Sequence, residues 1–502
     1  MSANLITFYN GTSVARRDIP EQGMGEFLGE IMDATARGWR VSAYFGEPCG
    51  PSVRLYCLLS SKTEGTLGMT STTVTEDGVP SIALLCPQVS LFEREIAEQF
   101  GLALEGHPWL KPVRFQDLLV SREGVDRPAS LPGVMDYYQV EGEEVHEVAV
   151  GPVHAGIIEP GHFRFQCYGE QVFHLEISLG YQHRGIERLL LGGPHPASIY
   201  QMETIAGDTT IGHAHAYAMI CEALMGTRAP ARAEAIRGIA LELERLANHT
   251  GDLGAIAGDV GYLPTSSFCG RIRGDFLNMT AELCGSRFGR GLVVPGGVAF
   301  DCTARQAELL GSRIEAARSD LTNAVELLWN TPSVMGRLEN TGVVSEETAR
   351  DLGLVGPAAR GCGLNLDIRR DHPFGIYRMS QIPVVTASTG DVHARTLLRW
   401  LEAEKSLDFI EEQLRQLPVG ACRNDTAGLA PDHVAVALTE GWRGEVCHVA
   451  MTDESGCFTR YKVVDPSFHN WQGLAMALRG QQISDFPLCN KSFNLSYCGF
   501  DL

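Results

Sequence analysis

The sequence lacks the closely spaced cysteine pairs that hold most protein-bound metal clusters. Its fourteen cysteines are spread from Cys49 to Cys498, and no two of them stand in a C-x-x-C pattern. Iron-sulfur and structural zinc sites normally use thiolates at such a spacing. We therefore expect reduced, mostly buried cysteines, as in a cytoplasmic protein, and no metal or cluster ligands within this chain.

Long apolar runs and basic residues are also scarce. No stretch of about 18 apolar residues is present, and residues 1–20 lack the pattern of a signal peptide, so we expect a soluble cytoplasmic chain. The 41 Lys and Arg residues against 61 Asp and Glu give a net charge of −20, which argues against a nucleic-acid partner. Phosphate-loop, H-E-x-x-H zinc and dinucleotide-binding motifs are absent.

What is present predicts an α+β fold in two parts. Apolar runs at 53–59 and 81–86 predict strands, and the Thr-rich segment 60–80 between them has the composition of a turn-rich loop. The charged segment 91–100 predicts an amphipathic helix, so residues 1–125 should form a small α/β domain. A polar, proline-containing stretch at 126–146 has the composition of a linker.

Residues 147–502 should form the second, mainly helical domain. Apolar residues repeat at helical spacing in three segments, and strand patterns stand at both ends of the region, after His162 and around 442–464. The three predicted helices cover 233–249, 310–328 and 394–417.

Several segments together resemble a known superfamily. Residues 92–108, FEREIAEQFGLALEGHP, resemble the small α/β peripheral-arm subunit of respiratory complex I. Five further segments resemble the large subunit shared by complex I and membrane-bound, energy-converting nickel-iron hydrogenases. These are GPVHAGIIEPGHFRF, GYQHRGIERLL, ELERLANH, VPGGVAFD and GDVHARTLLR. The order implies a fusion of two subunits, an arrangement typical of the hydrogenase branch.

The resemblance fails at the metal ligands. Laying the first hydrogenase cysteine pattern on ETIAGDTTIGHAHAY places the two cysteines at Ala206 and Thr209. Laying the second on the segment SFNLSYCGFDL places them at Ser496 and Gly499, with Cys498 one residue out of register. Hydroxyl, methyl and hydrogen side chains cannot bridge nickel and iron. The quinone-site histidine and tyrosine of complex I also correspond to other residues here, Ile158 and Gly207. The chain thus resembles most the hydrogenase-related group that lacks the metal cysteines.

Three residues are candidates for proton transfer. Glu187 matches a proton-relaying glutamate of hydrogenases; a shielded carboxylate can have a raised pKa, but it could equally pair with Arg184 or Arg188 on the same helix. His213 and Tyr217 stand one helical turn apart and should face the interior, where His213 could pass a proton or simply be a hydrogen-bonded core residue.

The remaining candidates line the expected cavity or support it. His154 and His162 flank a Gly/Pro-rich hairpin loop that enters the active cavity in the relatives, although they could merely hydrogen-bond the turn. Ala206, Thr209, Ser496 and Gly499 should line the same cavity. Asp391 and Arg395 are expected to form a structural charge network at a helix start, with Asp391 as a possible N-terminal cap.

The resemblance implies a peripheral subunit on the cytoplasmic face of the membrane. Its expected partners are an iron-sulfur small subunit, which would carry the cluster, and membrane-embedded pump subunits. The complex would couple redox or conformational change to ion translocation without a nickel-iron site. Two alternatives stay open: an active reductase of a quinone or another small acceptor, and a pure structural scaffold.

Overall fold

The computed structural model describes residues 4–75, 78–119 and 131–502. The first part of the chain forms an α/β domain around a sheet with strand order β1-β6-β5-β4, in which β3 pairs with β6. Helices α1 (Met24–Ala36) and α2 (Ser90–Phe100) pack against this sheet. Its strands are β1 (Ile6–Phe8), β3 (Glu21–Gln22), β4 (Arg40–Cys49), β5 (Ser52–Ser61) and β6 (Thr66–Val74). A separate short parallel pair, β7 (Gly78–Pro80) and β8 (Ala103–Glu105), lies beside α2.

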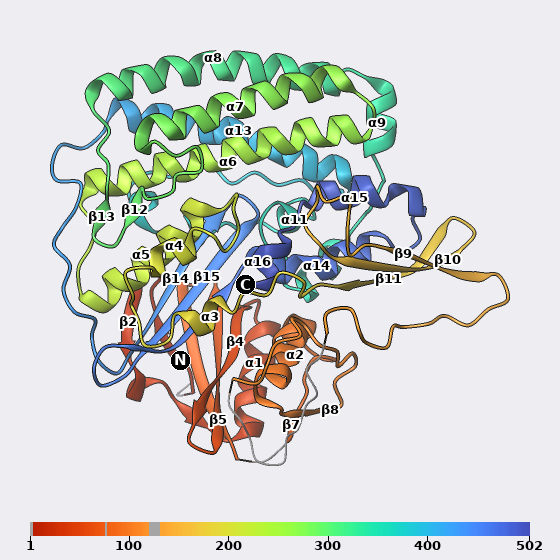
Figure 1. The fold of residues 1–502 in the computed structure, drawn as a ribbon, viewed down its shortest axis with the longest axis vertical. Coiled ribbons are helices and arrows are strands. Elements are labelled where there is room, and N and C mark those ends of the chain that lie inside the picture. The colour runs from red at the N-terminus through yellow and green to blue at the C-terminus, as the bar shows by residue number, and fades with distance from the viewer. Residues whose placement is uncertain (1–3, 76–77, 120–130) are drawn as a thin grey trace.

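One strand of the N-terminal region belongs to a different sheet. β2 (Thr12–Ala15) pairs antiparallel with β14 (His433–Gly441), with His433 opposite Ala15 and Val436 opposite Thr12. It completes the four-stranded sheet β16-β15-β14-β2, which also contains β15 (Gly444–Thr452) and β16 (Phe458–Val464). Segments more than 400 residues apart in the sequence are therefore hydrogen-bonded to each other. Figure 1 shows the red strand β2 beside the blue strands of this sheet.

Long helices cover one side of this sheet (Figure 1). α6 (Ala231–Asp259), α7 (Leu263–Cys284), α8 (Ala304–Trp329) and α13 (Val392–Arg415) pack side by side, and α5 (Thr210–Met225) lies against β14 and β15. In α8 the buried residues step by three or four, as the sequence predicts, because a single apolar stripe faces the neighbouring helices. The shorter helices are α9 (Pro332–Leu338), α10 (Glu346–Asp351), α11 (Gly356–Arg360) and α12 (Ile368–Asp371).

A second hairpin sheet and the C-terminal helices complete the molecule. β9 (Val145–Val150), β10 (His162–Tyr168) and β11 (Gln171–Ser178) form an antiparallel sheet, followed by α3 (Ile186–Leu189) and α4 (Ser198–Met202). β12 (Val293–Val294) pairs with β13 (Gly297–Val298). The C-terminal helices are α14 (Pro466–Ala477), α15 (Phe486–Phe493) and α16 (Tyr497–Asp501).

Two local predictions were wrong. Residues 81–86 form a turn instead of a strand, because Ser81 Oγ (2.5 Å) and the backbone N–H of Ile82 (3.0 Å) donate to the Glu93 carboxylate of α2. The Thr-rich segment that looked like a loop contains β6, which pairs with β1, β3 and β5. Its side chains are mostly buried, so tertiary packing outweighs the turn-like composition.

Among the described residues, no helix combines the length and the apolar character needed to span a bilayer.

Candidate functional site

The two segments that correspond to the hydrogenase cysteine motifs lie next to each other. The guanidinium of Arg184 donates to the carbonyl oxygens of Thr204 (2.5 Å) and Ile205 (2.9 Å) and also to that of Cys498 (2.9 Å). One cation thereby ties the turn before α5 to α16. The spatial pairing of the two segments therefore matches the pairing implied by the sequence resemblance.

A second arginine, which the sequence reasoning missed, also connects the two segments. Arg443, in the β14–β15 turn, forms a two-pronged ion pair with Asp208 at 2.6 and 2.8 Å and donates to Thr209 Oγ1 at 3.4 Å. Its Nε donates to the carbonyl of Asn494 at 2.5 Å. Asp208 raises the pKa of Arg443, so this buried cation is firmly held between the segments.

The four expected ligand positions hold no thiol. Ala206, Thr209 and Ser496 are buried, and Ser496 Oγ caps α16 by accepting from the N–H of Gly499 at 2.9 Å. A Cβ atom on Gly499 would stand 2.6 Å from Asp465 Oδ2 and 2.9 Å from Ser496 Oγ, so a larger side chain does not fit there without movement.

The nearest thiol does not replace the missing ligands. Cys498 Sγ lies 3.4 Å from Ser496 Oγ, and burial together with Glu159 raises the pKa of Cys498 to about 12. This thiol is protonated at neutral pH, and a single thiol cannot supply the four thiolates that hold nickel and iron. No cluster of three or more His, Cys, Asp or Glu side chains able to hold a metal ion occurs in the described part of the chain. The donor set at this site does not fit a thiolate-bound nickel-iron centre.

His213 belongs to a buried chain of hydrogen bonds. Its Nε2 lies 3.1 Å from Asp465 Oδ2 and its Nδ1 lies 3.0 Å from His448 Nε2. His448 Nδ1 lies 2.9 Å from the Tyr461 hydroxyl. His213 is fully buried, as predicted for its helix face.

One proton arrangement satisfies the whole chain with Asp465 ionised and both imidazoles neutral. Tyr461 then donates to His448, His448 donates to His213, and His213 donates to the Asp465 carboxylate. The hydrogen bond from His213 lowers the pKa of Asp465, while burial lowers the pKa of His448 well below its usual range. Every donor points toward Asp465, beside Gly499.

Tyr217 lies beside this chain. It is 3% exposed, as its position on the helix predicts, and its ring centroid lies 6.2 Å from that of Tyr461. Burial raises the pKa of Tyr217, so the phenol stays protonated at neutral pH.

Glu187 is buried, but its partners are not those predicted. Arg460 (2.8 Å) and Lys462 (3.0 Å), both on β16, bind the carboxylate, which also accepts the N–H of Val463 at 3.0 Å. Arg184 instead binds backbone carbonyls. Lys462 and Arg460 lower the pKa of Glu187 despite burial, contrary to the expected rise, so the carboxylate is ionised at neutral pH.

The same lysine joins the two parts of the chain. Lys462 Nζ lies 2.7 Å from each carboxylate oxygen of Glu95 on α2, and Arg114 pairs with Glu95 as well. All of these side chains are buried. The carboxylate expected to relay protons is therefore part of an ion-pair network between the N-terminal domain and β16.

The hairpin-loop histidines differ in position. His154 Nδ1 lies 3.1 Å from the carbonyl oxygen of Glu159, and its ring is 6.3 Å from that of Tyr497 on α16. The Glu159 carboxylate accepts the N–H of Cys498 at 3.2 Å, so the loop contacts the second ligand segment. His162 instead has its ring 5.2 Å from that of Tyr137.

The helix-start prediction was partly right. Asp391 Oδ1 accepts the N–H of Ala394 at 2.8 Å and so caps α13. Arg395 does not form the expected ion pair with it: its guanidinium donates to Ser492 Oγ and to the carbonyls of Gly390 and Gly342. The direct partners are a hydroxyl and two carbonyl groups.

Comparisons with known proteins identify the family. The model of the 49 kDa subunit of respiratory-chain NADH dehydrogenase matches residues 259–434 and 429–501, and that of the 30 kDa subunit matches residues 31–122. The carbon monoxide-induced hydrogenase of Rhodospirillum rubrum is 30% identical over 350 residues, which cover 70% of this chain and 97% of that protein. The chain belongs to this family of complex I and hydrogenase large subunits.

One further relative and one solved structure are also similar to this chain. Formate hydrogenlyase subunit 5 of Escherichia coli is 30% identical over 433 residues, covering 83% of this chain and 76% of that protein. A structure of the membrane-bound sulfane sulfur reductase, an archaeal respiratory membrane complex, contains a chain of the same fold. Its TM-score is 0.68 at 23% identity, with 73% of this chain and all of the other covered.

Residues that the sequence reasoning missed complete the site. Asp465 could have been noticed from the D-P-S sequence, which is typical of a helix N-terminus, and it does cap α14. His448 and Arg443 carry no comparable local signal, because only the fold brings them to His213 and Asp208.

Proposed function

We propose that the chain is a peripheral subunit, on the cytoplasmic face, of a membrane-anchored complex related to hydrogenases and complex I. The complex couples redox or conformational change to ion translocation and has no nickel-iron centre in this subunit. An iron-sulfur small subunit and membrane-embedded pump subunits are its partners. Family membership supports this assignment. The exposed apolar side chains of the hairpin loop between β9 and β10 indicate that a partner subunit covers this surface.

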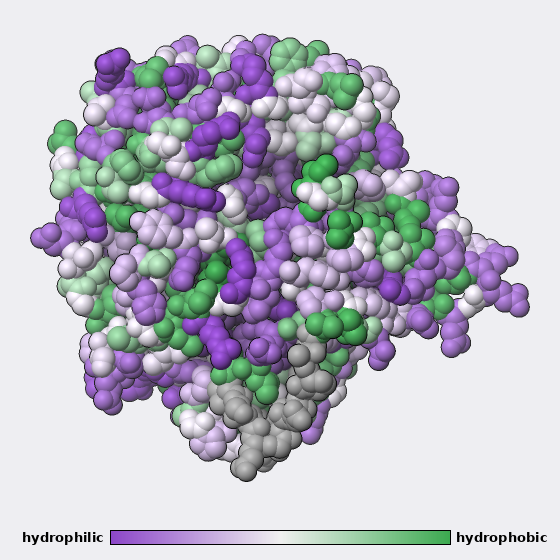
Figure 2. Space-filling model, viewed as in Figure 1, coloured by the Kyte–Doolittle hydropathy of each residue, from purple (hydrophilic) through white to green (hydrophobic). Residues whose placement is uncertain are grey.

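Three apolar side chains of that loop are exposed. Val153, Ile157 and Ile158 are 76%, 87% and 47% exposed. Figure 2 also shows apolar side chains gathered over the part of the surface where the β9–β11 sheet lies in Figure 1. Grouped exposed apolar residues are characteristic of surfaces that another protein covers.

The main support for the proposal is the lack of space for a ligand side chain at Gly499. Asp465 and Ser496 occupy the space that a ligand side chain would need, and no thiol replaces it. Metal analysis of the complex purified through its membrane subunits tests this: iron in the amount of the partner's clusters is expected, without nickel. Stoichiometric nickel that copurifies with this chain would overturn the proposal, and recovery of the chain without any membrane subunit would refute the assembly.

A second candidate function is the reduction of a quinone or another small acceptor at the same place. The buried hydrogen-bond chain favours it, because His213 and His448 could deliver a proton to Asp465, beside the former ligand positions. Quinone reduction by the intact complex should then fall on changing His213→Gln. His195→Gln is the matched control, since His195 hydrogen-bonds the carbonyl of Leu191 at an exposed site.

The outcomes separate the three hypotheses. Loss of reduction in His213→Gln with normal assembly supports the reductase. Unchanged ion translocation in an assembled complex that carries Gly499→Leu supports a structural scaffold, because this change displaces Asp465 and Ser496 from the former ligand position. Translocation that fails in an assembled Gly499→Leu complex, while no quinone is reduced, supports the leading proposal.

A further inference from the structure

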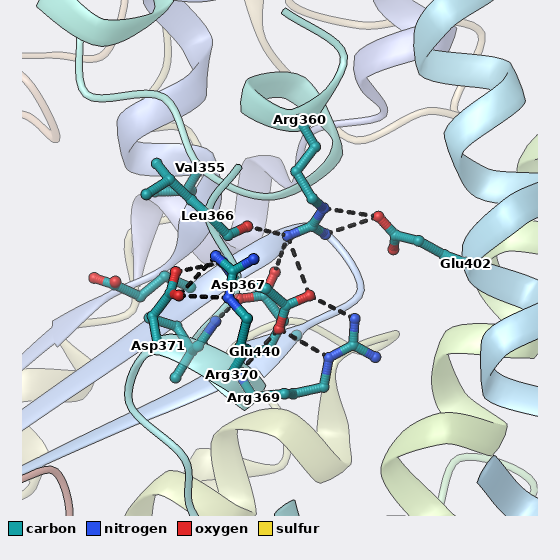
Figure 3. Close-up of polar contacts among 12 residues, drawn as sticks. Val355, Arg360, Leu366, Asp367, Arg369, Arg370, Asp371, Glu402 and Glu440 are labelled. Atoms are coloured by element: carbon teal, nitrogen blue, oxygen red, sulfur yellow. Dashed lines mark hydrogen bonds and ion pairs between the residues drawn. The ribbon is translucent and has the colours of Figure 1, made fainter. Parts of the chain in front are cut away.

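A cluster of buried charges lies apart from the site described above. It joins α6, α13, β14 and the segment that carries α11 and α12, and Figure 3 draws its centre. No member is more than 4% exposed. The members are the carboxylates of Glu242, Asp367, Glu402 and Glu440, the guanidiniums of Arg245, Arg360 and Arg369, and the imidazole of His249.

The charges of this cluster do not balance. Four carboxylates stand against three guanidiniums, which leaves one negative charge if every acid is ionised and His249 is neutral. An uncompensated charge in the protein interior is strongly unfavourable, and the usual remedy is the uptake of one proton. The composition of the cluster therefore calls for one bound proton.

Three of the four carboxylates are held strongly as anions. Glu242 accepts from Arg245 at 3.0 Å, from Arg369 at 3.1 Å and from the hydroxyls of Tyr377 and Ser406, each at 2.6 Å. These partners lower the pKa of Glu242 to about 2.

The second and third carboxylates also have close partners that stabilise the ionised form, while burial lowers the pKa of His249 and keeps its imidazole neutral. Glu402 lies 2.9 Å from both Arg360 and His249, and these groups lower its pKa well below the usual range. Asp367 pairs with Arg369 at 2.6 Å, which lowers its pKa.

Glu440 is the least stabilised of the four as an anion. Its carboxylate accepts from Arg360 at 2.8 Å and from the N–H of Ile368 at 3.0 Å. The same Arg360 nitrogen also lies 3.5 Å from Asp367, whose negative charge faces Glu440. Burial first, and then Asp367, raise the pKa of Glu440 to about 7, against the opposing effects of Arg360, Arg369 and Arg245.

Glu440 also borders a small polar cleft between the N-terminal domain and the helical part. The cleft has a volume of about 40 Å³, enough for a water molecule, and its lining includes Glu440, Asp367, Arg40, Glu445 and His372. Within the described residues, Glu445 Oε1 and His372 Nδ1 are buried without a hydrogen-bond partner. Unpartnered polar atoms of this kind are typical ligands of an internal water, which could carry a proton to Glu440.

We propose that Glu440 is an exchangeable proton-binding site, loaded through the cleft beside Arg40 and Glu445. The inference rests on the charge count and on the contacts of this cluster, and it does not depend on the proposed function. If the complex translocates protons, this group offers a buried place to hold one within the peripheral subunit.

Infrared spectroscopy of the purified full-length protein tests the protonation directly. The carbonyl band of a protonated carboxylic acid is expected to titrate near neutral pH and to be lost in Glu440→Gln. Glu93, Glu244 and Asp501 also have raised pKa values, so the difference spectrum between wild type and variant is needed to isolate Glu440. A difference spectrum without an acid carbonyl band at pH 6 would overturn the proposal.

Thermal unfolding provides a second readout with a matched control. The folded pKa of Glu440 lies above its unfolded value, so its contribution to stability is present at low pH and is lost as the pH rises through about 7. Glu440→Gln should therefore be at least as stable as wild type at pH 6, because it need not take up a proton on folding, and it should lose less stability than wild type between pH 6 and 8.5. Glu402→Gln, which removes a true anion, should melt several degrees lower at both pH values.

The control also defines a failed test. If Glu440→Gln does not fold, or melts as low as Glu402→Gln at pH 6, Glu440 must be charged in the native protein and the proposal is wrong.

Discussion

Replacing Gly499 by alanine tests whether the former ligand position is closed. A Cβ atom there would stand 2.6 Å from Asp465 Oδ2, and Asp465 cannot move freely because it accepts hydrogen bonds from His213 Nε2 (3.1 Å) and from the N–H of Ser467 (2.8 Å). Overpacking of this kind costs about 1–3 kcal/mol, while glycine to alanine in a helix regains about 0.5–1 kcal/mol. We expect a net loss of about 1–2 kcal/mol in the free energy of unfolding.

Gly207→Ala is the matched control in the first ligand segment. A Cβ atom on Gly207 meets no atom within 4 Å, so the change in stability should stay within about 0.5 kcal/mol. Urea unfolding of the full-length protein, followed by tryptophan fluorescence, measures both variants by linear extrapolation. Equal stabilities of Gly499→Ala and wild type would refute the reasoning, because they would show that Asp465 yields and that the site is open to a larger side chain.

Three further predictions concern other buried groups. Lys462→Met should lower the free energy of unfolding by about 3–5 kcal/mol, because it leaves two buried carboxylates without their shared cation. The control Lys405→Met removes an exposed ion pair and should cost less than about 1 kcal/mol. Calorimetry that finds equal losses for the two variants would contradict this prediction. Burial raises the pKa of Glu244 to about 8, above its value in the unfolded chain. The stability of the protein should therefore fall as the pH rises through 8. Melting curves recorded at several pH values should show that Glu244→Gln removes this loss. Asp391→Ala should cost about 0.5–2 kcal/mol through the lost cap of α13, measured by urea unfolding; an unchanged midpoint would show that the cap is dispensable.

The sequence predicted the parts of the fold that depend on local periodicity. The three long helices were found because one apolar stripe on each faces a neighbour, and the buried position of His213 followed from the same spacing. Asp391 was recognised because a cap is a local signal. The turn at 81–86 was missed because an apolar run of six residues looks the same in a strand and in a buried turn.

The contacts of the site could not be predicted in the same way. Glu187 was expected either to relay protons or to pair with Arg184 or Arg188, but its partners come from a strand more than 270 residues further along the chain. Arg443 and His448 reach the site only because β14 and β15 lie against α5. Long-range placement of charged side chains depends on the assembled fold, and no sequence spacing encodes it.

The pairing of β2 with β14 has a consequence for how this protein could be divided. If the chain were divided between the regions that match the 30 kDa and the 49 kDa subunits, β14 would have an unpaired edge, because β2 would belong to the other fragment. Exposed strand edges recruit other strands, so the isolated C-terminal fragment would be prone to self-association. A C-terminal fragment intended to fold by itself would need residues 12–15 fused to it, so that β2 still pairs with β14.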